Sequence, residues 1–174
     1  TTFCEFVGKI PFIFSLKAQD PLYICNMKQI LLTLMIAFVL TGCVDREQVD
    51  RDAIEQYLED NNLTAEVTDD GIYYIIDQPG FGAKPNLASE VTVHYEGFLL
   101  DGSKFDSSYD RGAPATFRLT GVVRGWQLGI PLFREGGKGT LLIPSELGYG
   151  SDSPSDDIPR NSVLIFNINL IEVK

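Results

Sequence analysis

The sequence predicts an α+β domain in which an antiparallel β-sheet packs against one short α-helix. From residue 67 onward, short apolar stretches alternate with turn-forming residues, which is typical of antiparallel strands. Within residues 90–100, Val91, Val93 and Tyr95 fall on one face and polar residues on the other. Helical spacing appears in this region only at residues 126–132, where Pro131 keeps the helix short.

A separate helix is predicted ahead of the sheet, over residues 45–62. Apolar side chains recur there at helical spacing, and acidic side chains occupy the opposite face. Asp45 and Gln48 have the spacing of a capping box at its start. We interpret this segment as a short helix that packs on the domain or serves as a spacer. Its predicted apolar face consists of Val49, Ala53, Ile54, Tyr57 and Leu58.

The strands follow one another with recognisable turns between them. Residues 78–86 are rich in Gly and Pro and are predicted to form a loop. Asp101-Gly102 indicates a hairpin turn, because both residues tolerate a positive φ. The predicted strands are residues 71–76, 90–100, 116–119, 138–143 and 163–173.

Residues 27–42 have the organisation of an export signal. Met27 and Lys28 begin it, and an apolar run at residues 30–40 follows, too short to span a bilayer, which takes about 20 apolar residues. The ending Leu40-Thr41-Gly42-Cys43 resembles the bacterial lipobox, whose cysteine is diacylated before cleavage on its N-terminal side. Cys43 is therefore predicted to carry a lipid anchor that attaches the protein to a membrane.

Val44 follows the predicted anchor at the position where an Asp would signal retention in the inner membrane. In a Gram-negative cell envelope, we therefore expect the protein to be attached to the periplasmic face of the outer membrane.

These observations divide the chain into four segments. The segments are an upstream extension absent from the native product (1–26), a lipoprotein signal peptide (27–42), a lipid anchor with a helical spacer (43–66) and the folded domain (67–174).

Composition excludes several functional classes. A net charge of −10 and the lack of a basic patch argue against nucleic-acid binding. All three cysteines lie at or before residue 43, so the folded domain has no disulfide, thiol nucleophile or cysteine-bound metal. His94 is the single histidine and is interpreted as structural. No Gly-x-Ser-x-Gly or P-loop pattern occurs, and no cofactor or metal is expected.

The domain contains five distinctive segments, Val93-His94-Tyr95-Glu96-Gly97, Asp101-Gly102-Ser103-Lys104-Phe105-Asp106-Ser107-Ser108, Val123-Arg124-Gly125-Trp126, Ile143-Pro144-Ser145-Glu146-Leu147-Gly148-Tyr149-Gly150 and Val163-Leu164-Ile165-Phe166. In this order, across residues 67–174, they resemble the FKBP-type peptidyl-prolyl cis/trans isomerases. The resemblance implies an antiparallel sheet half-wrapped around one short helix, with a shallow apolar pocket between them.

The resemblance also assigns roles to single residues. Trp126 matches the pocket floor on which a proline ring rests, and Ile158 matches the rim. The Val123 N–H and the Tyr149 hydroxyl match groups that bind the carbonyl oxygens of a ligand, and Val122 matches a rim strand. Asp106 and Arg111 match a buried pair that braces the wall. The ten matching positions are Tyr95, Phe105, Asp106, Arg111, Val122, Val123, Trp126, Tyr149, Ile158 and Phe166.

Three places depart from the family pattern. Ala115 stands where eukaryotic members often have an aromatic residue, and residues 120–122 form a shorter connection. Residues 151–157 carry Pro154 and three aspartates, ending at Asp157, where His and an apolar residue often stand. The family's macrolide inhibitors are thus expected as ligands of reduced affinity, because Ala115 and Asp157 argue against strong binding.

The resemblance implies an isomerase that acts on proline-containing polypeptides. Together with the predicted export and anchor, it predicts an enzyme that accelerates the folding of exported proteins, which X-Pro isomerisation can limit. Two alternatives are a proline-peptide-binding or chaperone lipoprotein with weak catalysis, and a structural envelope lipoprotein without a peptide site.

Overall fold

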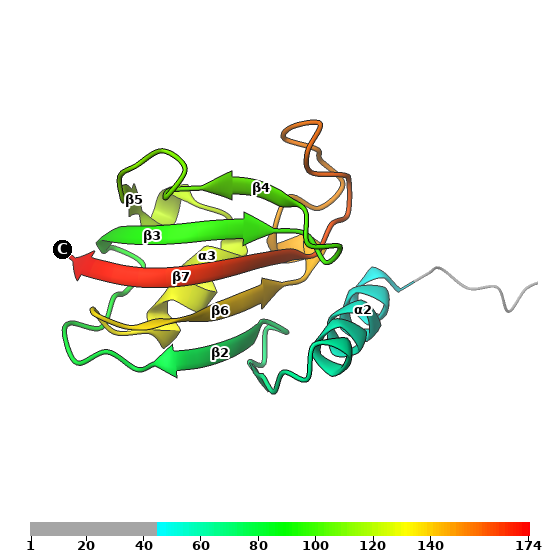
Figure 1. The fold of residues 1–174 in the computed structure, drawn as a ribbon, viewed down its shortest axis with the longest axis horizontal. Helices are drawn as coiled ribbons and strands as arrows, with labels where there is room; N and C mark the ends of the chain where they lie inside the picture. Colours follow the sequence, from blue (N-terminus) through cyan, green and yellow to red (C-terminus); the bar gives the residue numbers. More distant parts are fainter. Residues whose placement is uncertain (1–44) are drawn as a thin grey trace, which may run out of the picture. The chain divides into compact units, whose positions relative to one another are not determined.

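The computed structural model describes residues 45–174, so the predictions for the upstream extension, the signal peptide and Cys43 lie outside the described residues. Residues 45–174 form a compact unit through their own contacts. Its seven strands make one antiparallel sheet in the order β1-β2-β6-β7-β3-β4, and β5 also pairs with β3 (Figure 1). The strands are β1 (Glu66–Val67), β2 (Tyr73–Gln78), β3 (Glu90–Phe98), β4 (Lys104–Ser107), β5 (Ala115–Arg118), β6 (Lys138–Ile143) and β7 (Leu164–Val173).

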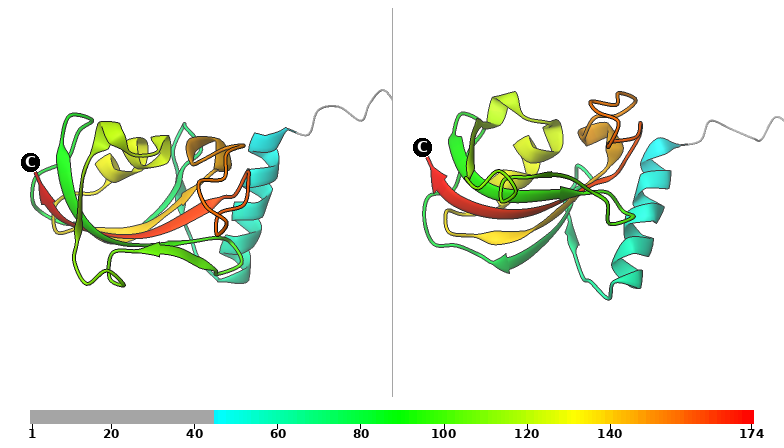
Figure 2. Two further views of the ribbon diagram at one scale, coloured as in Figure 1. Left: turned by 90° about the horizontal axis from the view of Figure 1, so that it is seen from above. Right: turned by 45° about the horizontal axis from the view of Figure 1, so that its top comes forward.

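The sheet curves around α3, which lies on its concave side, while α2 lies at one end of the sheet (Figure 2). This arrangement confirms the predicted fold class. The helix predicted at residues 126–132 begins at Arg124 and continues past Gly129 as a 3₁₀ helix containing Pro131, which has no N–H for an α-helical bond. The helices are α2 (Arg46–Asp60), η1 (Leu119–Gly121), α3 (Arg124–Gly129), η2 (Ile130–Leu132) and η3 (Ser145–Leu147).

Alternation along the strands directs side chains into two apolar clusters. On β6, Leu141 and Ile143 join the cluster on the α3 side of the sheet, whereas Leu142 joins a second cluster that includes Ile54 and Leu58 of α2. Because successive side chains of a strand point to opposite faces, this end of β6 is covered on both faces of the sheet. Val91, Val93 and Tyr95 of β3 all point into the α3 side, as the sequence predicts.

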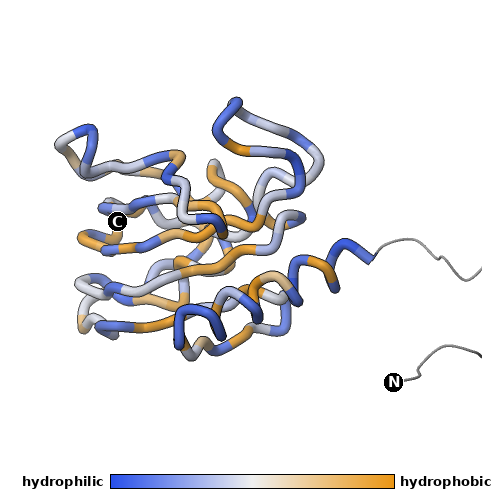
Figure 3. Tube along the Cα trace, turned by 45° about the vertical axis from the view of Figure 1, so that its right-hand side comes forward, coloured by the Kyte–Doolittle hydropathy of each residue, from blue (hydrophilic) through white to orange (hydrophobic). Residues whose placement is uncertain are grey.

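Helix α2 packs Ile54 and Leu58 against the sheet, and Figure 3 shows hydrophobic and hydrophilic residues alternating along the helix. Full burial of Ile54 and near-full burial of Leu58 contribute about 1.5–3 kcal/mol each. None of the helices within residues 45–174 is both long enough and apolar enough to cross a membrane.

Two details of the predicted α2 are wrong. Val49, assigned to the apolar face, is 40% exposed, whereas its neighbour Asp50 is 3% exposed because it binds Ser145. Asp45 caps the helix by accepting a hydrogen bond from the Glu47 N–H at 3.2 Å. The predicted capping box with Gln48 is not formed, because Asp45 accepts from the N–H of Glu47 and not from that of Gln48, while the Gln48 amide donates to Asp52 Oδ1.

Candidate functional site

A pocket of about 480 Å³ opens between the concave face of the sheet and α3. Strands β3, β4, β5 and β7 supply its walls, and α3 supplies its floor. Nine of the ten predicted site residues line it, and Arg111 does not. The lining residues are Tyr95, Phe105, Asp106, Phe117, Gly121, Val122, Val123, Trp126, Tyr149, Pro154, Ser155, Ile158 and Phe166.

Trp126 forms the floor and is enclosed by aromatic rings on several sides. Its ring centroid lies 5.2 Å from those of Tyr95 and Phe166, with interplanar angles of 88° and 84°, and Phe117 is also edge-on at 5.6 Å. The residue is only 4% exposed, but it borders the open pocket and is therefore not sealed in the interior. Its Nε1 is buried and has no hydrogen-bond partner within residues 45–174.

Two glycines allow this close packing. A Cβ at Gly125 would lie 2.3 Å from Ile143 Cγ2, so only glycine lets α3 approach β6 and place Trp126. A Cβ at Gly97 would lie 2.6 Å from the Phe105 ring and 3.0 Å from the Phe166 ring. The missing side chain at position 97 thus gives two pocket walls the space that they occupy.

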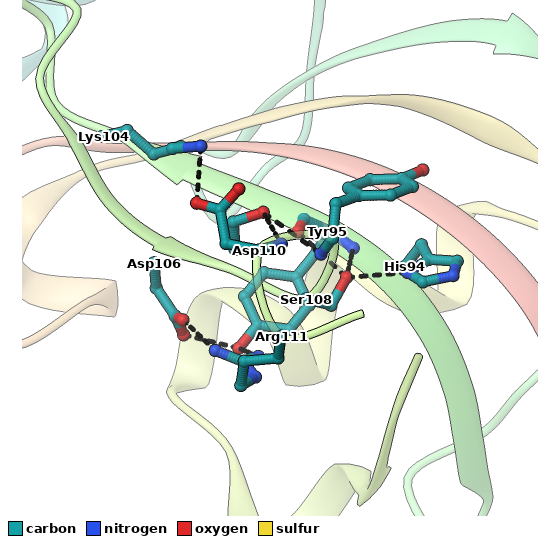
Figure 4. A network of polar contacts seen from close by, with 9 residues as sticks. His94, Tyr95, Lys104, Asp106, Ser108, Asp110 and Arg111 are labelled. Carbon is teal, nitrogen blue, oxygen red and sulfur yellow. Dashed lines mark hydrogen bonds and ion pairs between the residues drawn. The ribbon is translucent and has the colours of Figure 1, made fainter. Parts of the chain in front are cut away.

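Tyr95, Asp106 and Arg111 form a closed polar network beside the pocket (Figure 4). The Tyr95 hydroxyl donates to Asp106 Oδ2 at 2.5 Å, Arg111 Nη2 donates to the Tyr95 oxygen at 2.8 Å, and Arg111 Nη1 donates to Asp106 Oδ1. The guanidinium also lies 5.4 Å from the Tyr95 ring centroid, within cation–π range. Arg111 thus holds the pocket wall from outside the cavity.

The prediction that Asp106 and Arg111 are buried is wrong, because their side chains are 39% and 48% exposed. Burial raises the pKa of Tyr95 to about 12, helped by its hydrogen bond to Asp106, so Tyr95 remains a hydrogen-bond donor at neutral pH. Partial burial opposes ionisation of Asp106, but hydrogen bonds from Tyr95 and Arg111 outweigh it and lower the pKa of this carboxyl.

The lowered pKa of Asp106 predicts a specific loss of stability in acid. As pH falls below about 4, the unfolded chain binds a proton at this residue before the folded chain does, so folding is disfavoured. The stabilisation is present above that pH and disappears as pH falls through the folded-state pKa. Urea denaturation between about pH 2 and pH 6 should show a shallower acid dependence in Asp106→Asn than in the wild type, with most of the difference between about pH 2 and pH 4. Identical slopes in the two proteins would refute the assignment.

The rim brings together the remaining predicted residues. Partial burial and the charge of Asp106 raise the pKa of Tyr149, which keeps its hydroxyl protonated as a donor. Val123 precedes the first residue of α3, where N–H groups have no intrahelical acceptor. The prediction that Val122 lies on a rim strand is wrong, because Val122 follows the 3₁₀ helix η1 as a single extended residue that pairs with no strand.

His94 faces away from the aromatic pocket, in keeping with its structural interpretation. Its Nδ1 lies 2.9 Å from Ser108 Oγ, and its ring stacks on Tyr109 at 4.3 Å. Figure 4 shows this contact next to the Tyr95 network. Within residues 45–174, no group of His, Cys, Asp or Glu side chains is arranged to hold a metal ion.

Sequence reasoning missed four lining residues, namely Phe117, Gly121, Pro154 and Ser155. Phe117 could have been predicted from the sequence, because it lies two residues after the wall position Ala115 and therefore on the same face of the strand. Pro154 and Ser155 belong to a loop whose path depends on tertiary contacts, so only their neighbourhood to Ile158 hinted at the pocket.

Comparison with known proteins places this geometry in a family. A profile described as FKBP-type peptidyl-prolyl cis-trans isomerase matches residues 82–171. The chain belongs to this family. The FKBP fold also appears in the crystal structure of FkpA from Escherichia coli, with a TM-score of 0.66, 32% identity and coverage of 92% of this chain and 74% of that one. The crystal structure of AtFKBP13 has a TM-score of 0.58 at 38% identity, covering 64% of this chain and 99% of that one.

Curated relatives carry related names. FkpA of Aeromonas hydrophila is 41% identical over 137 residues, covering 74% of this chain and 51% of that protein. Peptidyl-prolyl cis-trans isomerase Mip of Coxiella burnetii is 45% identical over 104 residues, and the match covers 60% of this chain and 45% of the Mip protein. The chain therefore spans about half the length of the curated relatives that it matches.

Proposed function

We propose that the protein catalyses cis/trans isomerisation of peptidyl-prolyl bonds in proline-containing polypeptides. The observation that carries this proposal is the open aromatic pocket with Trp126 as its floor, Tyr149 at its rim and the Val123 N–H beside it. Membership of the FKBP family supports the same chemistry.

The pocket suits a reaction in which no covalent bond breaks. Rotation about a peptide bond costs about 18–20 kcal/mol because the amide loses resonance, and the twisted amide has less charge separation than the planar one. An apolar surround therefore penalises the planar form relative to the twisted one, which lowers the barrier. The proline ring would rest on Trp126. Acceleration by five decades requires a barrier about 7 kcal/mol lower.

Two donors would hold the backbone while the proline ring turns. Tyr149 and Val123 line the pocket, and their hydroxyl and N–H groups would bind substrate carbonyl groups on either side of the prolyl bond. Fixing these carbonyls confines rotation to the reacting bond. The entropy cost of orienting the substrate is then met on binding, before the transition state is reached. No nucleophile, metal or cofactor enters this mechanism.

A protease-coupled assay with proline tetrapeptides tests the proposal on a chain of residues 44–174. We expect isomerisation to be much faster than the uncatalysed reaction, which takes roughly tens to hundreds of seconds. No acceleration at micromolar enzyme, together with retained binding of the same peptides, would favour a proline-peptide-binding or chaperone module. Absence of both rate and binding would favour a structural lipoprotein.

Replacing Tyr149 by phenylalanine should lower kcat/KM by about five- to tenfold, because one neutral hydrogen bond contributes about 1 kcal/mol. The free energy of unfolding should hardly change, since the phenol ring stays in place and the side chain is partly exposed. Activity that equals the wild type would remove Tyr149 from the mechanism. Tyr109→Phe, at an exposed phenol outside the pocket, is the matched control.

We also propose that the enzyme acts in the cell envelope on exported proteins, tethered through a diacylated Cys43 on the periplasmic face of the outer membrane. Support comes from the signal-like residues 27–42, the lipobox-like ending and Val44. Membrane fractionation and intact mass test this proposal. We expect the wild-type protein to be found in the membrane fraction and to carry acyl chains, and we expect the Cys43→Ala protein to lack them.

Macrolide inhibitors are proposed as ligands of reduced affinity, because Asp157 places a charge on the loop beside the rim residue Ile158.

A further inference from the structure

Helix α2 lies before the family-matched residues 82–171, yet it contacts the loop that carries Tyr149. Asp50 of α2 is only 3% exposed. Its Oδ2 accepts hydrogen bonds from the Ser145 N–H at 2.8 Å and the Ser145 hydroxyl at 2.5 Å. Both views of Figure 2 show α2 next to the segment that follows β6.

Ser145 in turn holds both neighbours of Tyr149. Its carbonyl accepts the Gly148 N–H at 3.0 Å and the Gly150 N–H at 2.8 Å. Gly150 has a φ of +57°, a conformation that favours glycine, and its own carbonyl accepts the Asn161 N–H at 2.7 Å. The position of the Tyr149 backbone is therefore set through Ser145.

A buried carboxyl group is an unusual way to attach a helix. Burial of a polar side chain costs free energy unless hydrogen bonds compensate, and apolar packing by Ile54 and Leu58 already docks α2 on the sheet. The two bonds to Ser145 add direction, because they fix one residue of η3 relative to one residue of α2. Loss of Asp50 would leave two buried donors of Ser145 without their acceptor.

We propose that Asp50 is a positioning residue for the prolyl-isomerase site, acting through Ser145 to hold the Tyr149 hydroxyl where it meets the substrate carbonyl. This inference rests on the proposed isomerase function. Helix α2 thereby becomes part of the catalytic unit, although none of its residues lines the pocket.

The test compares three α2 variants in a chain of residues 44–174. Asp50→Ala should lower kcat/KM by at most the roughly five- to tenfold expected of Tyr149→Phe, and it should speed hydrogen exchange of the Gly148 and Gly150 amides by about tenfold. Asp50→Asn keeps an acceptor oxygen and should recover most of both properties. Asp52→Ala, the matched control, removes an exposed carboxylate of the same helix that contacts Gln48, and should behave as wild type.

A double variant separates positioning from general stability. In a Tyr149→Phe background, Asp50→Ala should cause no further loss of kcat/KM, because the hydroxyl that it positions is already gone. An equal loss of kcat/KM in both backgrounds, or unchanged exchange of the Gly150 amide in Asp50→Ala, would overturn the inference.

Ser145→Ala is the second variant if Asp50→Ala does not fold. It removes only the hydroxyl bond to Asp50 and should change kcat/KM and amide exchange in the same direction by smaller factors. Wild-type values of both in Ser145→Ala would overturn the inference. Exchange is measured independently of activity, so an inactive wild type would refute the isomerase function alone.

Discussion

Replacing Trp126 by alanine is expected to lower the free energy of unfolding by about 3–5 kcal/mol and to eliminate measurable isomerase activity. The indole is 4% exposed and contacts the rings of Tyr95, Phe117 and Phe166, so its removal leaves a large cavity in the wall of the domain. The same change deletes the surface that supports a proline ring. Urea denaturation measures the stability, and the tetrapeptide assay at a temperature where the variant remains folded measures the activity.

Phe133 provides a control that also removes a large buried aromatic side chain. It is fully buried on the α3 side of the sheet but does not line the pocket. Phe133→Ala should therefore lose about 3–5 kcal/mol of stability while keeping its activity per folded molecule. If the Trp126 and Phe133 variants lose activity only in proportion to their unfolded fractions, the pocket is not the reaction site.

The sequence predicted β3 and β6 best. The prediction for residues 138–143 agrees with β6 at both ends, and the polar and apolar faces of residues 90–98 agree with β3. On β3 one face packs beneath α3 and the other is only partly buried, so burial imposes a period of two on the sequence, whereas the apolar run at residues 141–143 of β6 is buried on both faces. Local pattern and tertiary environment coincide there.

Other elements were missed where a distant contact decides the structure. Strand β4 has three polar residues among its four, so alternation gives no signal, and it forms only through pairing with β3. Asp50 is buried by a partner 95 residues further along the chain, which helical periodicity cannot reveal. Periodicity consequently assigned the buried position to Val49.

The site shows the same division. Family motifs predicted nine residues that the fold brings around one pocket, and their catalytic roles remain predictions. The exposure of the Asp106–Arg111 pair could not be predicted from motifs, because it depends on how far the loop after β4 covers the two side chains.

Asp106→Ala is expected to lower kcat/KM by about tenfold or more while the free energy of unfolding falls by only about 1–2 kcal/mol. The carboxylate is the acceptor for both Tyr95 and Arg111, so its loss releases a wall residue and the cation that holds it. The stability cost is small because the ion pair is partly exposed to solvent. Circular dichroism and urea denaturation report on the fold, and the tetrapeptide assay reports on turnover.

Asp110→Ala is the charge-matched control for this prediction. Asp110 lies just after β4, the strand that carries Asp106, and it pairs with Lys104 at 2.6 Å, but it does not line the pocket. Both variants remove one negative charge, so a general electrostatic effect on substrate approach would affect them alike. A large loss in Asp106→Ala with full activity in Asp110→Ala would show that geometry at the Tyr95 wall matters, because only the first variant frees the ring beside which the proline turns. Equal activity in the two variants would mean that the Tyr95 network serves the fold and leaves the reaction untouched.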